Sequence, residues 1–442
     1  MTSFGYGRVS RSAPTMGAAP TIAFAGDSVT YASISQDTAT LTANFVQGPG
    51  FWVPALAHQR VRTRKDLNFG VNGETSTGLL ARIDAICACD ADIVAVKIGT
   101  NDVNTAGPTT LATYKNNITQ ILRRLLAAGK LVIAICPLNR SLVSATARPL
   151  LQQMIRWVRE LQWRGYRNLY VVDPNIFWTD PLSPTSAPKT YYDYDGLHPR
   201  GLGSYFVWKP VADLIRTLYP TVAVNPVVSI ADVYEPDWNP SGNLLPNGIM
   251  DGSVAVSGSG GPTFNGSGMA ASTTILGSAG TGGVITGLTV ACSKATLANG
   301  LPAQQIAISG TGTGSGASPG SGIIVRQSVV SPATKMAAGD TIEALATIEW
   351  DGVGSQNIAG LRARLRTVEG GTAYDVVDGW DSIADLLPSV NDSWTLRTPP
   401  LLLTAAPSSV ELSIWATLRN QSSATFAGTF RVGALHVGKV IA

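Results

Sequence analysis

The sequence predicts a three-layer α/β domain, flavodoxin-like with a parallel five-stranded sheet, followed by an all-β sandwich or jelly-roll domain. Up to about residue 220, short apolar runs alternate with segments of helical periodicity, which is typical of an α/β fold. Beyond that point helical periodicity disappears, Gly, Ser and Thr become abundant, and apolar residues recur at every second position. We therefore expect an N-terminal tail (1–20), the α/β domain (21–222), a linker (223–242) and the β domain (243–442).

Five apolar runs are the expected strands of the sheet, and four segments between or after them are the expected helices. The strands are predicted at Thr21–Ala25, Leu67–Val71, Ile93–Ile98, Leu131–Cys136 and Leu169–Val172. The helices are predicted at Thr75–Ile86, Leu111–Ala127, Ala145–Trp163 and from Asp195 toward Leu218. This alternation favours parallel strands that are covered by helices on both faces.

Strand-like runs dominate the second half of the chain. Clear period-two runs lie at Thr341–Trp350, Glu411–Arg419 and Thr429–Val440. Residues 252–320 are rich in glycine but still contain apolar runs such as Gln305–Ile308, which indicates strands with long loops. Strands at this spacing with glycine-rich turns favour a sandwich or jelly roll.

Four short polar motifs occur in the α/β part. They are Gly26-Asp27-Ser28, Asn72-Gly73, Gly99-Thr100-Asn101-Asp102 and Asp195-Gly196-Leu197-His198. The first three directly follow predicted strands, and the fourth precedes the last predicted helix. Ligands of open α/β sheets bind beyond the carboxyl ends of the strands, so we expect these motifs to form one site.

These motifs resemble the four blocks of the SGNH, or GDSL-type, hydrolase family, over about residues 21–219. The resemblance implies that Ser28 is the nucleophile, His198 the general base and Asp195 the residue that orients the imidazole. It also implies an oxyanion hole formed by the backbone N–H groups of Ser28 and Gly73 and the side-chain amide of Asn101. After Ser28 the chain continues Val-Thr-Tyr where the family more often has Leu-Thr or Leu-Ser and a small residue, so the substrate need not be shared.

The chemistry of the residue types favours the same roles. A serine hydroxyl needs a base within hydrogen-bond reach, and of the three histidines, His58, His198 and His436, only His198 has a carboxylate close in sequence. Glycine at position 73 lets the substrate carbonyl approach the backbone closely. The neutral amide of Asn101 can donate to a developing oxyanion without acting as a base.

Each motif alone also has a purely structural interpretation. Gly-Asp-Ser is a common turn, Asn-Gly is less specific still, and Asp195 could cap a helix. Asp27 and Asp102 are expected to hold turns and loops rather than to react. Residues 316–320 match the Gly-x-Ser-x-Gly pattern of α/β-hydrolases, but Ser318 lies in a Gly/Ser/Thr tract and Pro319 removes a backbone donor, so we assign this match to a loop.

The function predicted from these residues is a serine esterase that cleaves short acyl groups, acetyl above all, from a polysaccharide. The alternative is a catalytically idle protein that binds glycans or serves as a structural phage-tail protein or adhesin. The short sequence segments at residues 243–248 and 428–432 resemble those of carbohydrate-binding-type jelly rolls and phage-tail proteins. Trp238, Trp350, Trp380 and Trp394 could stack on sugars or pack in the core, whereas Trp415 is expected in the core.

Composition narrows the range of partners. Of the 442 residues 45% are hydrophobic and 14% charged; no apolar run is long enough to span a membrane, and no secretory signal peptide is visible at residues 1–20. Residues 1–220 carry 22 Lys and Arg against 14 Asp and Glu, net +8, and residues 221–442 carry 10 against 15, net −5. Neither half has the basic clusters that nucleic-acid binding needs. The sequence does not fix where the protein is located. It could belong to a virion tail, or it could be exported by another route.

We expect no cofactor and no metal ion. The four cysteines, Cys87, Cys89, Cys136 and Cys292, show no disulfide pattern, and the Cys87–Cys89 pair lacks further metal ligands nearby. The expected partner is an ester substrate, which could be an O-acetylated polysaccharide. The β domain could in addition join copies of the chain into an oligomer.

Overall fold

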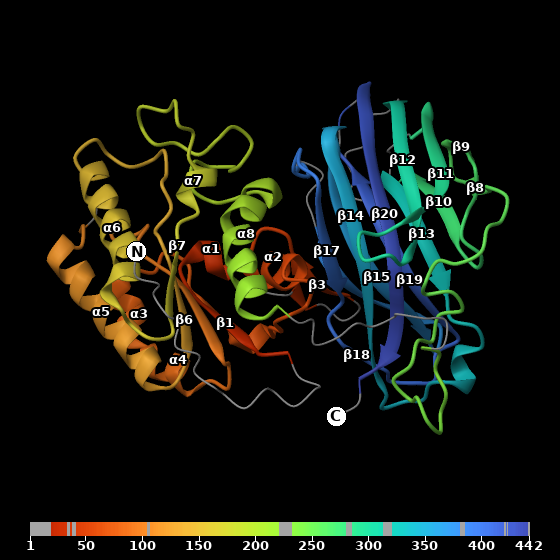
Figure 1. Cartoon of the computed structure of the whole chain (residues 1–442), viewed down its shortest axis with the longest axis horizontal. Coiled ribbons are helices and arrows are strands. Elements are labelled where there is room, and N and C mark those ends of the chain that lie inside the picture. The colour runs from red at the N-terminus through yellow and green to blue at the C-terminus, as the bar shows by residue number, and fades with distance from the viewer. Residues whose placement is uncertain are drawn as a thin grey trace, which may run out of the picture.

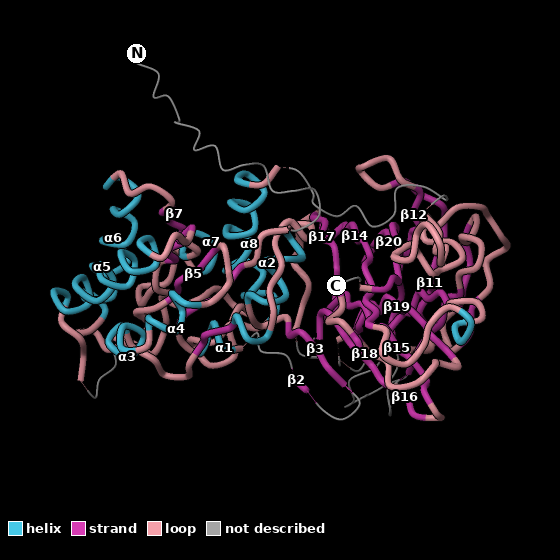
Figure 2. Tube along the Cα trace, turned by 90° about the horizontal axis from the view of Figure 1, so that it is seen from below, coloured by secondary structure: helices cyan, strands magenta, loops and turns pink. Residues whose placement is uncertain are grey.

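The computed structural model describes residues 19–32, 36–37, 41–103, 107–220, 232–279, 285–312, 321–380, 385–419, 421 and 423–440. The chain forms a helix-rich N-terminal half and a strand-rich C-terminal half that lie side by side (Figure 1). Seen from below, the long helices gather in the first half and strands fill the second (Figure 2). Most of the predicted tail, residues 223–231 of the predicted linker, and the Gly-x-Ser-x-Gly match at 316–320 lie outside the described residues.

The N-terminal half contains the predicted parallel five-stranded sheet. Its strand order is β4-β1-β5-β6-β7, which is the 2-1-3-4-5 order of flavodoxin-like folds. The strands are β1 (Ile22–Gly26), β4 (Asn68–Gly70), β5 (Ile93–Lys97), β6 (Leu131–Ile135) and β7 (Leu169–Val172). All neighbouring strands pair in parallel, so their carboxyl ends meet at one edge.

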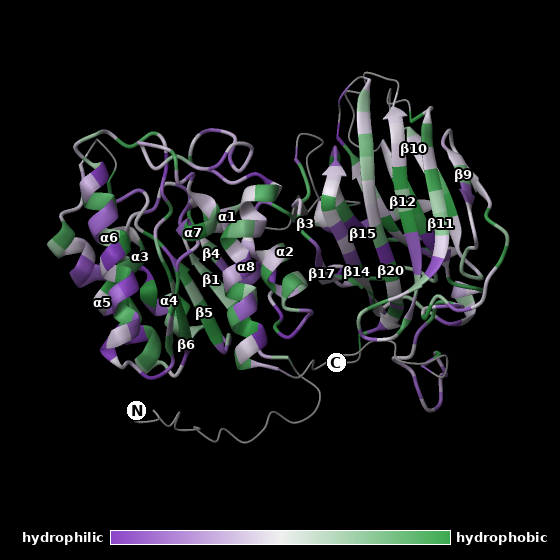
Figure 3. Cartoon of the chain, turned by 45° about the horizontal axis from the view of Figure 1, so that its top comes forward, coloured by the Kyte–Doolittle hydropathy of each residue, from purple (hydrophilic) through white to green (hydrophobic). Residues whose placement is uncertain are grey.

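Helices cover both faces of this sheet, whose central strands are mostly apolar (Figure 3). One face packs against α3 (Ser76–Ala81), α4 (Ile83–Ala88), α5 (Leu111–Ala127) and α6 (Arg148–Glu160). The other packs against α2 (Pro49–Leu56) and α8 (Gly201–Leu218). The remaining helical turns are α1 (Ser28–Tyr31), η1 (Lys65–Leu67), η2 (Leu161–Arg164) and α7 (Asn175–Trp178).

Two predicted helices differ from those observed. The segment predicted at Thr75–Ile86 is broken at Arg82, whose backbone leaves the helical region (φ −116°, ψ 13°). The last helix begins at Gly201 rather than at Asp195. The Asp195 carboxylate accepts hydrogen bonds from the backbone N–H groups of Leu197 and His198, which folds this segment into a tight turn, and Pro199 follows directly.

The C-terminal half is built mainly of β-strands, as predicted, in two sheets. One has the order β2-β3-β16-β15-β19-β13-β10-β8 and the other β17-β14-β20-β12-β11-β9, with β18 beside β14. The assignment of a jelly-roll type stays a prediction. The strands are β8 (Gly258–Ser259), β9 (Thr263–Gly266), β10 (Thr274–Ala279), β11 (Leu288–Thr296), β12 (Pro302–Gly312), β13 (Ser321–Ser328), β14 (Thr341–Gln356), β15 (Ile358–Glu369), β16 (Thr372–Trp380), β17 (Asp392–Arg397), β18 (Leu401–Leu402), β19 (Ser409–Leu418) and β20 (Ala424–Lys439), with η3 at Pro332–Thr334.

Two short strands from the N-terminal half extend a sheet of the C-terminal half. The strand β3 (Leu41–Phe45) pairs in parallel with β16, and β2 (Gln36–Asp37) pairs with β3. The backbone N–H of Val46 then donates to the carbonyl of Trp380, over 3.1 Å. Residues from the predicted first domain thus pair with a strand of the predicted second domain. The ranges of the two domains stay a prediction.

A buried interface joins the two halves. In it α2 and α8 face β17, and the Trp52 ring meets the Trp394 ring edge-on with centroids 6.0 Å apart. The Tyr205 hydroxyl donates to the Asp392 carboxylate over 2.5 Å, and Lys209 pairs with the same carboxylate over 3.0 Å. One continuous cluster of buried apolar residues therefore runs from the α/β sheet into the sandwich.

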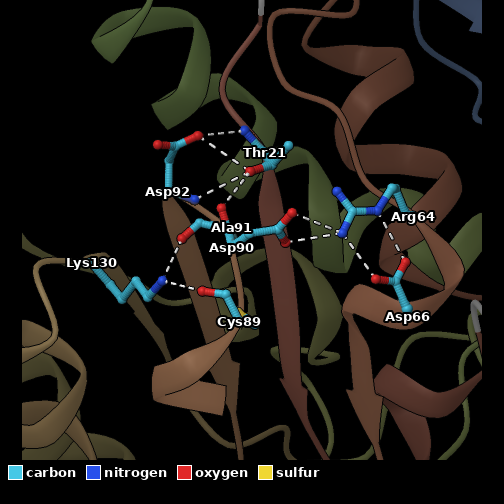
Figure 4. A network of polar contacts seen from close by, with 8 residues as sticks. All are labelled: Thr21, Arg64, Asp66, Cys89, Asp90, Ala91, Asp92 and Lys130. Carbon is cyan, nitrogen blue, oxygen red and sulfur yellow. Dashed lines mark hydrogen bonds and ion pairs between the residues drawn. The ribbon is translucent and has the colours of Figure 1, made fainter. Parts of the chain in front are cut away.

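The amino-terminal edge of the parallel sheet is held by polar contacts (Figure 4). The Arg64 guanidinium pairs with both Asp66 and Asp90, and Thr21 hydrogen-bonds Asp92. The Lys130 ammonium donates to the carbonyls of Cys89 and Ala91, over 2.5 and 2.8 Å. The side chains at this edge thus bind one another and the nearby backbone. The four motifs lie at the opposite edge of the sheet. No helix among the described residues is long and apolar enough to cross a membrane.

Candidate active site

The carboxyl edge of the sheet brings the four sequence motifs together. Ser28 opens α1 directly after β1, Gly73 follows β4, and Asn101 follows β5. The fourth motif reaches the same edge from the segment before α8. Together they surround a cleft of about 410 Å³ that is lined by Ser28, Tyr31, Ala32, Asn72, Gly73, Asn101, Tyr194, Leu197 and His198.

Ser28, His198 and Asp195 form a hydrogen-bonded chain. The Oγ of Ser28 lies 2.8 Å from Nε2 of His198, and Nδ1 of His198 lies 2.6 Å from Oδ2 of Asp195. With the ring proton on Nδ1, His198 donates to the carboxylate and its Nε2 is free to accept the serine proton. The arrangement can therefore activate a serine hydroxyl.

Asp195 is held so that it stays ionised. Burial disfavours its charge, but hydrogen bonds from the backbone and ring of His198 and from the backbone of Leu197 outweigh burial and lower the pKa of the carboxyl. Oδ1 accepts from both backbone N–H groups, which leaves Oδ2 for the imidazole. One carboxylate thus fixes both the turn and the orientation of the ring.

Gly73 and Asn101 line the same cleft as Ser28. Gly73 has φ +72°, a conformation that other residues adopt only with strain, and no atom lies within 4 Å of the place where a Cβ would stand. The Nδ2 of Asn101 donates one hydrogen to the carbonyl of Glu74 over 3.0 Å. Since an amide nitrogen carries two hydrogens, the second remains for a ligand.

A buried ion pair supports the turn that carries Ser28. Lys97, at the end of β5, is fully buried, and its ammonium lies 3.0 and 2.9 Å from the two carboxylate oxygens of Asp27 and 3.1 Å from the Thr100 hydroxyl. Burial lowers the pKa of Lys97, which the Asp27 charge opposes. Asp27 also accepts from the backbone N–H of Val29 over 3.1 Å and so caps α1.

Asp102 joins the loop after β5 to the start of α3. Its carboxylate accepts from the Ser76 hydroxyl over 2.5 Å and from the Ser76 backbone N–H over 2.9 Å, and Asn117 donates to the same hydroxyl. Burial raises the pKa of Asp102, although the hydrogen bonds from Ser76 oppose this. The contacts of Asp27 and Asp102 are those of residues that hold turns and loops.

Three residues at the site are absent from the sequence-based prediction. Lys97 is a charged residue at the end of a buried strand, which is a readable signal because buried charges need partners. Glu74 accepts from Asn101 through its backbone carbonyl, a contact for which the sequence gives no signal. The Tyr194 ring stacks on the His198 ring with centroids 5.7 Å apart.

The other two histidines are remote from the cleft. His58 lies at the interface of the halves, with Nδ1 3.2 Å from the Thr395 hydroxyl. His436 is in β20, and burial lowers the pKa of both imidazoles, that of His58 to about 4. Neither approaches Ser28, so among the described histidines only His198 is placed to act on it.

The tryptophans of the C-terminal half divide by burial. Trp350 and Trp394 are fully buried in the core, so their rings are closed to a sugar. Trp415 is also buried, as expected, although Arg362 and Arg364 stack on it, 4.9 and 5.0 Å from its centroid. Trp380 is partly buried beneath Arg362, and Trp238 is 68% exposed.

The described residues hold no group of three or more His, Cys, Asp and Glu side chains that is arranged for a metal ion. All four cysteines are free thiols, and Cys136 and Cys292 are buried.

Residues 24–204 match the sequence model of the GDSL-like lipase/acylhydrolase family. This part of the chain belongs to that family. The match begins within β1 and ends in the first turn of α8, so it includes all four motifs. The N-terminal half is therefore a GDSL-type hydrolase domain of the esterase and acylhydrolase class.

Solved structures similar to this chain include proteins whose names carry the same family label. A putative lipolytic protein of the G-D-S-L family from Desulfitobacterium hafniense is 16% identical over 44% of this chain and 99% of its own, with a TM-score of 0.34. A GDSL-like lipase from Bacteroides thetaiotaomicron is 18% identical over 45% and 89%, with a TM-score of 0.33. A catalytic mutant of an acetylxylan esterase from Geobacillus stearothermophilus is 19% identical over 45% and 95%, with a TM-score of 0.35. No curated protein matches the chain.

Proposed function

We propose that this chain is a serine esterase that removes short acyl groups, acetyl above all, from a polysaccharide. The observation that carries the proposal is the hydrogen-bonded chain Ser28–His198–Asp195, over 2.8 and 2.6 Å, whose first two members line the cleft. A domain that had become catalytically idle would have no need to keep this geometry. The arrangement therefore favours an enzyme over a protein that only binds or assembles.

In the proposed reaction, Ser28 Oγ attacks the ester carbonyl while Nε2 of His198 takes its proton. The carbonyl oxygen becomes an oxyanion that accepts hydrogen bonds from the backbone N–H groups of Ser28 and Gly73 and from Nδ2 of Asn101. The tetrahedral species collapses, His198 returns the proton to the leaving alcohol, and an acyl-serine remains. Water activated by His198 then attacks the acyl carbon and releases the carboxylic acid and free Ser28.

The lining of the cleft supports a short acyl group and a polar alcohol. A long fatty chain needs continuous apolar walls, whereas here polar Asn72, Asn101 and His198 interrupt the apolar Ala32 and Leu197. Tyr31 and Tyr194, which are 43% and 56% exposed, offer aromatic rings at the rim. Aromatic rings with exposed faces suit the apolar faces of sugar rings.

The test is hydrolysis of chromogenic esters from acetate to long-chain acyl groups, by the wild type, Ser28→Ala and the control Ser328→Ala, an exposed serine of β13. We expect acetate to be the best substrate, and activity to survive in the control and disappear in Ser28→Ala. Equal rates in the wild type and Ser28→Ala would exclude Ser28 as nucleophile. A preference for long chains, or the absence of acetate release from O-acetylated polysaccharides, would overturn the substrate class.

A further inference from the structure

A second pocket lies in the C-terminal half, outside the cleft at Ser28. It has a volume of about 240 Å³ and is formed by the end of β14, the beginning of β15 and the segment before β17. Its lining residues are Ser355, Gln356, Asn357, Ile358, Leu386, Leu387 and Ser389. Pockets for drug-sized ligands measure about 300–1,000 Å³, so this one has room for a single small ring.

The lining has the character of a site for an uncharged polyol. It contains no ionisable side chain and combines hydroxyl and amide groups with an apolar wall of Ile358, Leu386 and Leu387. In the described part of the chain, the side chains of Ser355, Gln356 and Ser389 make no hydrogen bond to another residue, so their donors and acceptors are free for a ligand. A sugar ring presents both hydroxyl groups and apolar C–H faces, which this combination matches.

A short chain of contacts joins this pocket to the segment that carries His198. The backbone N–H of Arg419 donates to the carbonyl of Asn357 over 2.9 Å. The Arg419 guanidinium in turn lies over the Tyr191 ring, 5.4 Å from its centroid. Tyr191 lies three residues before Tyr194, which lines the cleft at Ser28, and both rings are 56% exposed.

The pocket is also fixed relative to the catalytic residues. Asp385 directly precedes the wall residues Leu386 and Leu387, and it is buried. Its carboxylate accepts from the backbone N–H of Gly201 over 3.1 Å and from Nε2 of Gln47 over 3.2 Å. Gly201 follows His198 by three residues, so the wall of the pocket and the candidate base are held in one rigid frame.

We propose that this pocket binds a second sugar unit of the glycan whose acyl group is removed at Ser28. The inference rests on the proposed function. One saccharide chain would place its esterified unit in the cleft, pass over the exposed rings of Tyr194 and Tyr191, and place a further unit among Ser355, Gln356 and Ser389. The C-terminal half would then act as part of the substrate site and would favour polymers over single sugars.

The test is a substitution that fills the pocket, Ser389→Trp, because Ser389 is exposed at its rim and a large side chain can be accommodated there. The matched control is Ser328→Trp, an exposed serine of β13 outside both pockets. For each protein, kcat and KM are measured on a chromogenic acetate and on a panel of O-acetylated oligosaccharides from disaccharides to octasaccharides. A milder variant, Gln356→Ala, removes one amide of the lining without adding bulk.

In the wild type and in Ser328→Trp, kcat/KM is expected to rise by about tenfold or more with chain length, through KM, which corresponds to one good contact site. Ser389→Trp is expected to lose this gain while its rate on the small acetate stays unchanged, and Gln356→Ala to lose part of it. The unchanged rate on the small acetate also reports that Ser389→Trp is folded. A wild type without any gain across the panel, or a gain that persists in Ser389→Trp, would overturn the second sugar site.

Binding measured without turnover separates this inference from the proposed function. Calorimetric titration of the longest oligosaccharides into Ser28→Ala and into Ser28→Ala/Ser389→Trp is expected to give a dissociation constant at least about tenfold higher in the double variant. If the wild type fails to hydrolyse acetate while the binding difference persists, the esterase proposal fails and the sugar site stands. If acetate is cleaved normally and the two dissociation constants are equal, only the sugar site fails.

Discussion

At the scale of single residues, the turn around Asp195 sets which ring nitrogen of His198 carries the proton. Oδ1 of Asp195 is occupied by two backbone donors, so only Oδ2 faces the imidazole. A carboxylate in this place accepts a hydrogen bond, which keeps the ring proton on Nδ1 and leaves Nε2 free for Ser28. The catalytic competence of the serine thus depends on which atom of residue 195 faces the ring.

The substitution Asp195→Asn replaces the hydrogen-bond acceptor that faces the imidazole with a donor. The amide oxygen would stay with the backbone donors and the NH₂ group would face Nδ1, which would move the ring proton to Nε2. In that tautomer His198 cannot accept the serine proton, and we expect kcat on chromogenic acetate to fall by about 10⁴-fold. The control Asp84→Asn alters an exposed aspartate of α4 and should retain full activity. Near-wild-type turnover in Asp195→Asn would contradict the assigned role.

Asn101 provides a second prediction at this scale. Its Nδ2 is oriented by the Glu74 carbonyl, so its free hydrogen is positioned before the substrate binds. Asn101→Ala removes one proposed oxyanion donor and should lower kcat by about 10²–10³-fold. Asn116→Ala, on the exposed side of α5, is the control. If kcat remains within a factor of two of wild type while KM rises, Asn101 contributes to binding rather than to the transition state.

At the scale of elements, the buried Lys97–Asp27 pair connects the end of β5 to the turn between β1 and α1. The close approach of these strands leaves no room beside the turn, since a Cβ on Gly26 would stand 2.0 Å from the Lys97 carbonyl oxygen. Both charged groups are removed from water, and each depends on the other. The position of Ser28 therefore depends on a pair that takes no part in the chemistry.

Breaking this pair should cost more than removing it. Lys97→Met leaves the Asp27 carboxylate buried without its partner, and we expect a loss of about 3–5 kcal/mol in the free energy of unfolding. In the double variant Asp27→Asn/Lys97→Met no buried charge remains, while an asparagine can still cap α1, so part of that loss should be recovered. Urea unfolding of the wild type, both single variants and the double variant measures the coupling. Strictly additive losses would show that the two side chains act independently.

The elements also show what the sequence could predict and why the rest escaped it. The β-strands and α5 were predictable because their apolar spacing is regular, and the position of the motifs at strand ends predicted from the sequence alone that Ser28, Gly73 and Asn101 lie together. The start of α8 was not, because the turn at Asp195 depends on side-chain-to-backbone hydrogen bonds that periodicity does not report. The pairing of β3 with β16 joins residues more than 300 positions apart, which no local pattern can indicate.

At the scale of the whole molecule, the two halves share a buried interface and a continuous sheet. The strand β3 belongs by sequence to the first half and by pairing to the second, and Asp385 and Arg419 reach from the second half to the segments that flank His198. The β-rich half thus contacts the hydrolase domain both before and after His198 in the sequence. We therefore expect the chain to unfold as one cooperative unit rather than as two.

His58 lies in this interface and should make the stability of the molecule depend on pH. Its Nδ1 and Nε2 lie 3.2 and 3.4 Å from the hydroxyls of Thr395 and Ser393 in β17. Burial, and then the nearby Arg60, lower the pKa of His58 from 6.5 to about 4, against the opposing charge of Asp392. The folded state therefore holds the neutral imidazole, whereas the unfolded chain takes up a proton once the pH falls below about 6.5.

The free energy of unfolding should consequently fall as the pH is lowered from about 6.5 to about 4, by roughly 3 kcal/mol from this group alone. His58→Asn isolates the effect from that of the carboxylates, because asparagine does not titrate and tolerates the left-handed backbone at this position (φ 50°). The measurement is urea unfolding at a series of pH values. Near pH 8 the variant should be less stable than the wild type, because the substitution removes the contacts of the imidazole. The difference in the free energy of unfolding should shrink or reverse near pH 4, because there the wild type is destabilised by a buried imidazole that stays neutral while the unfolded chain binds a proton. Parallel curves for the two proteins would mean that His58 titrates normally and that the interface admits its charge.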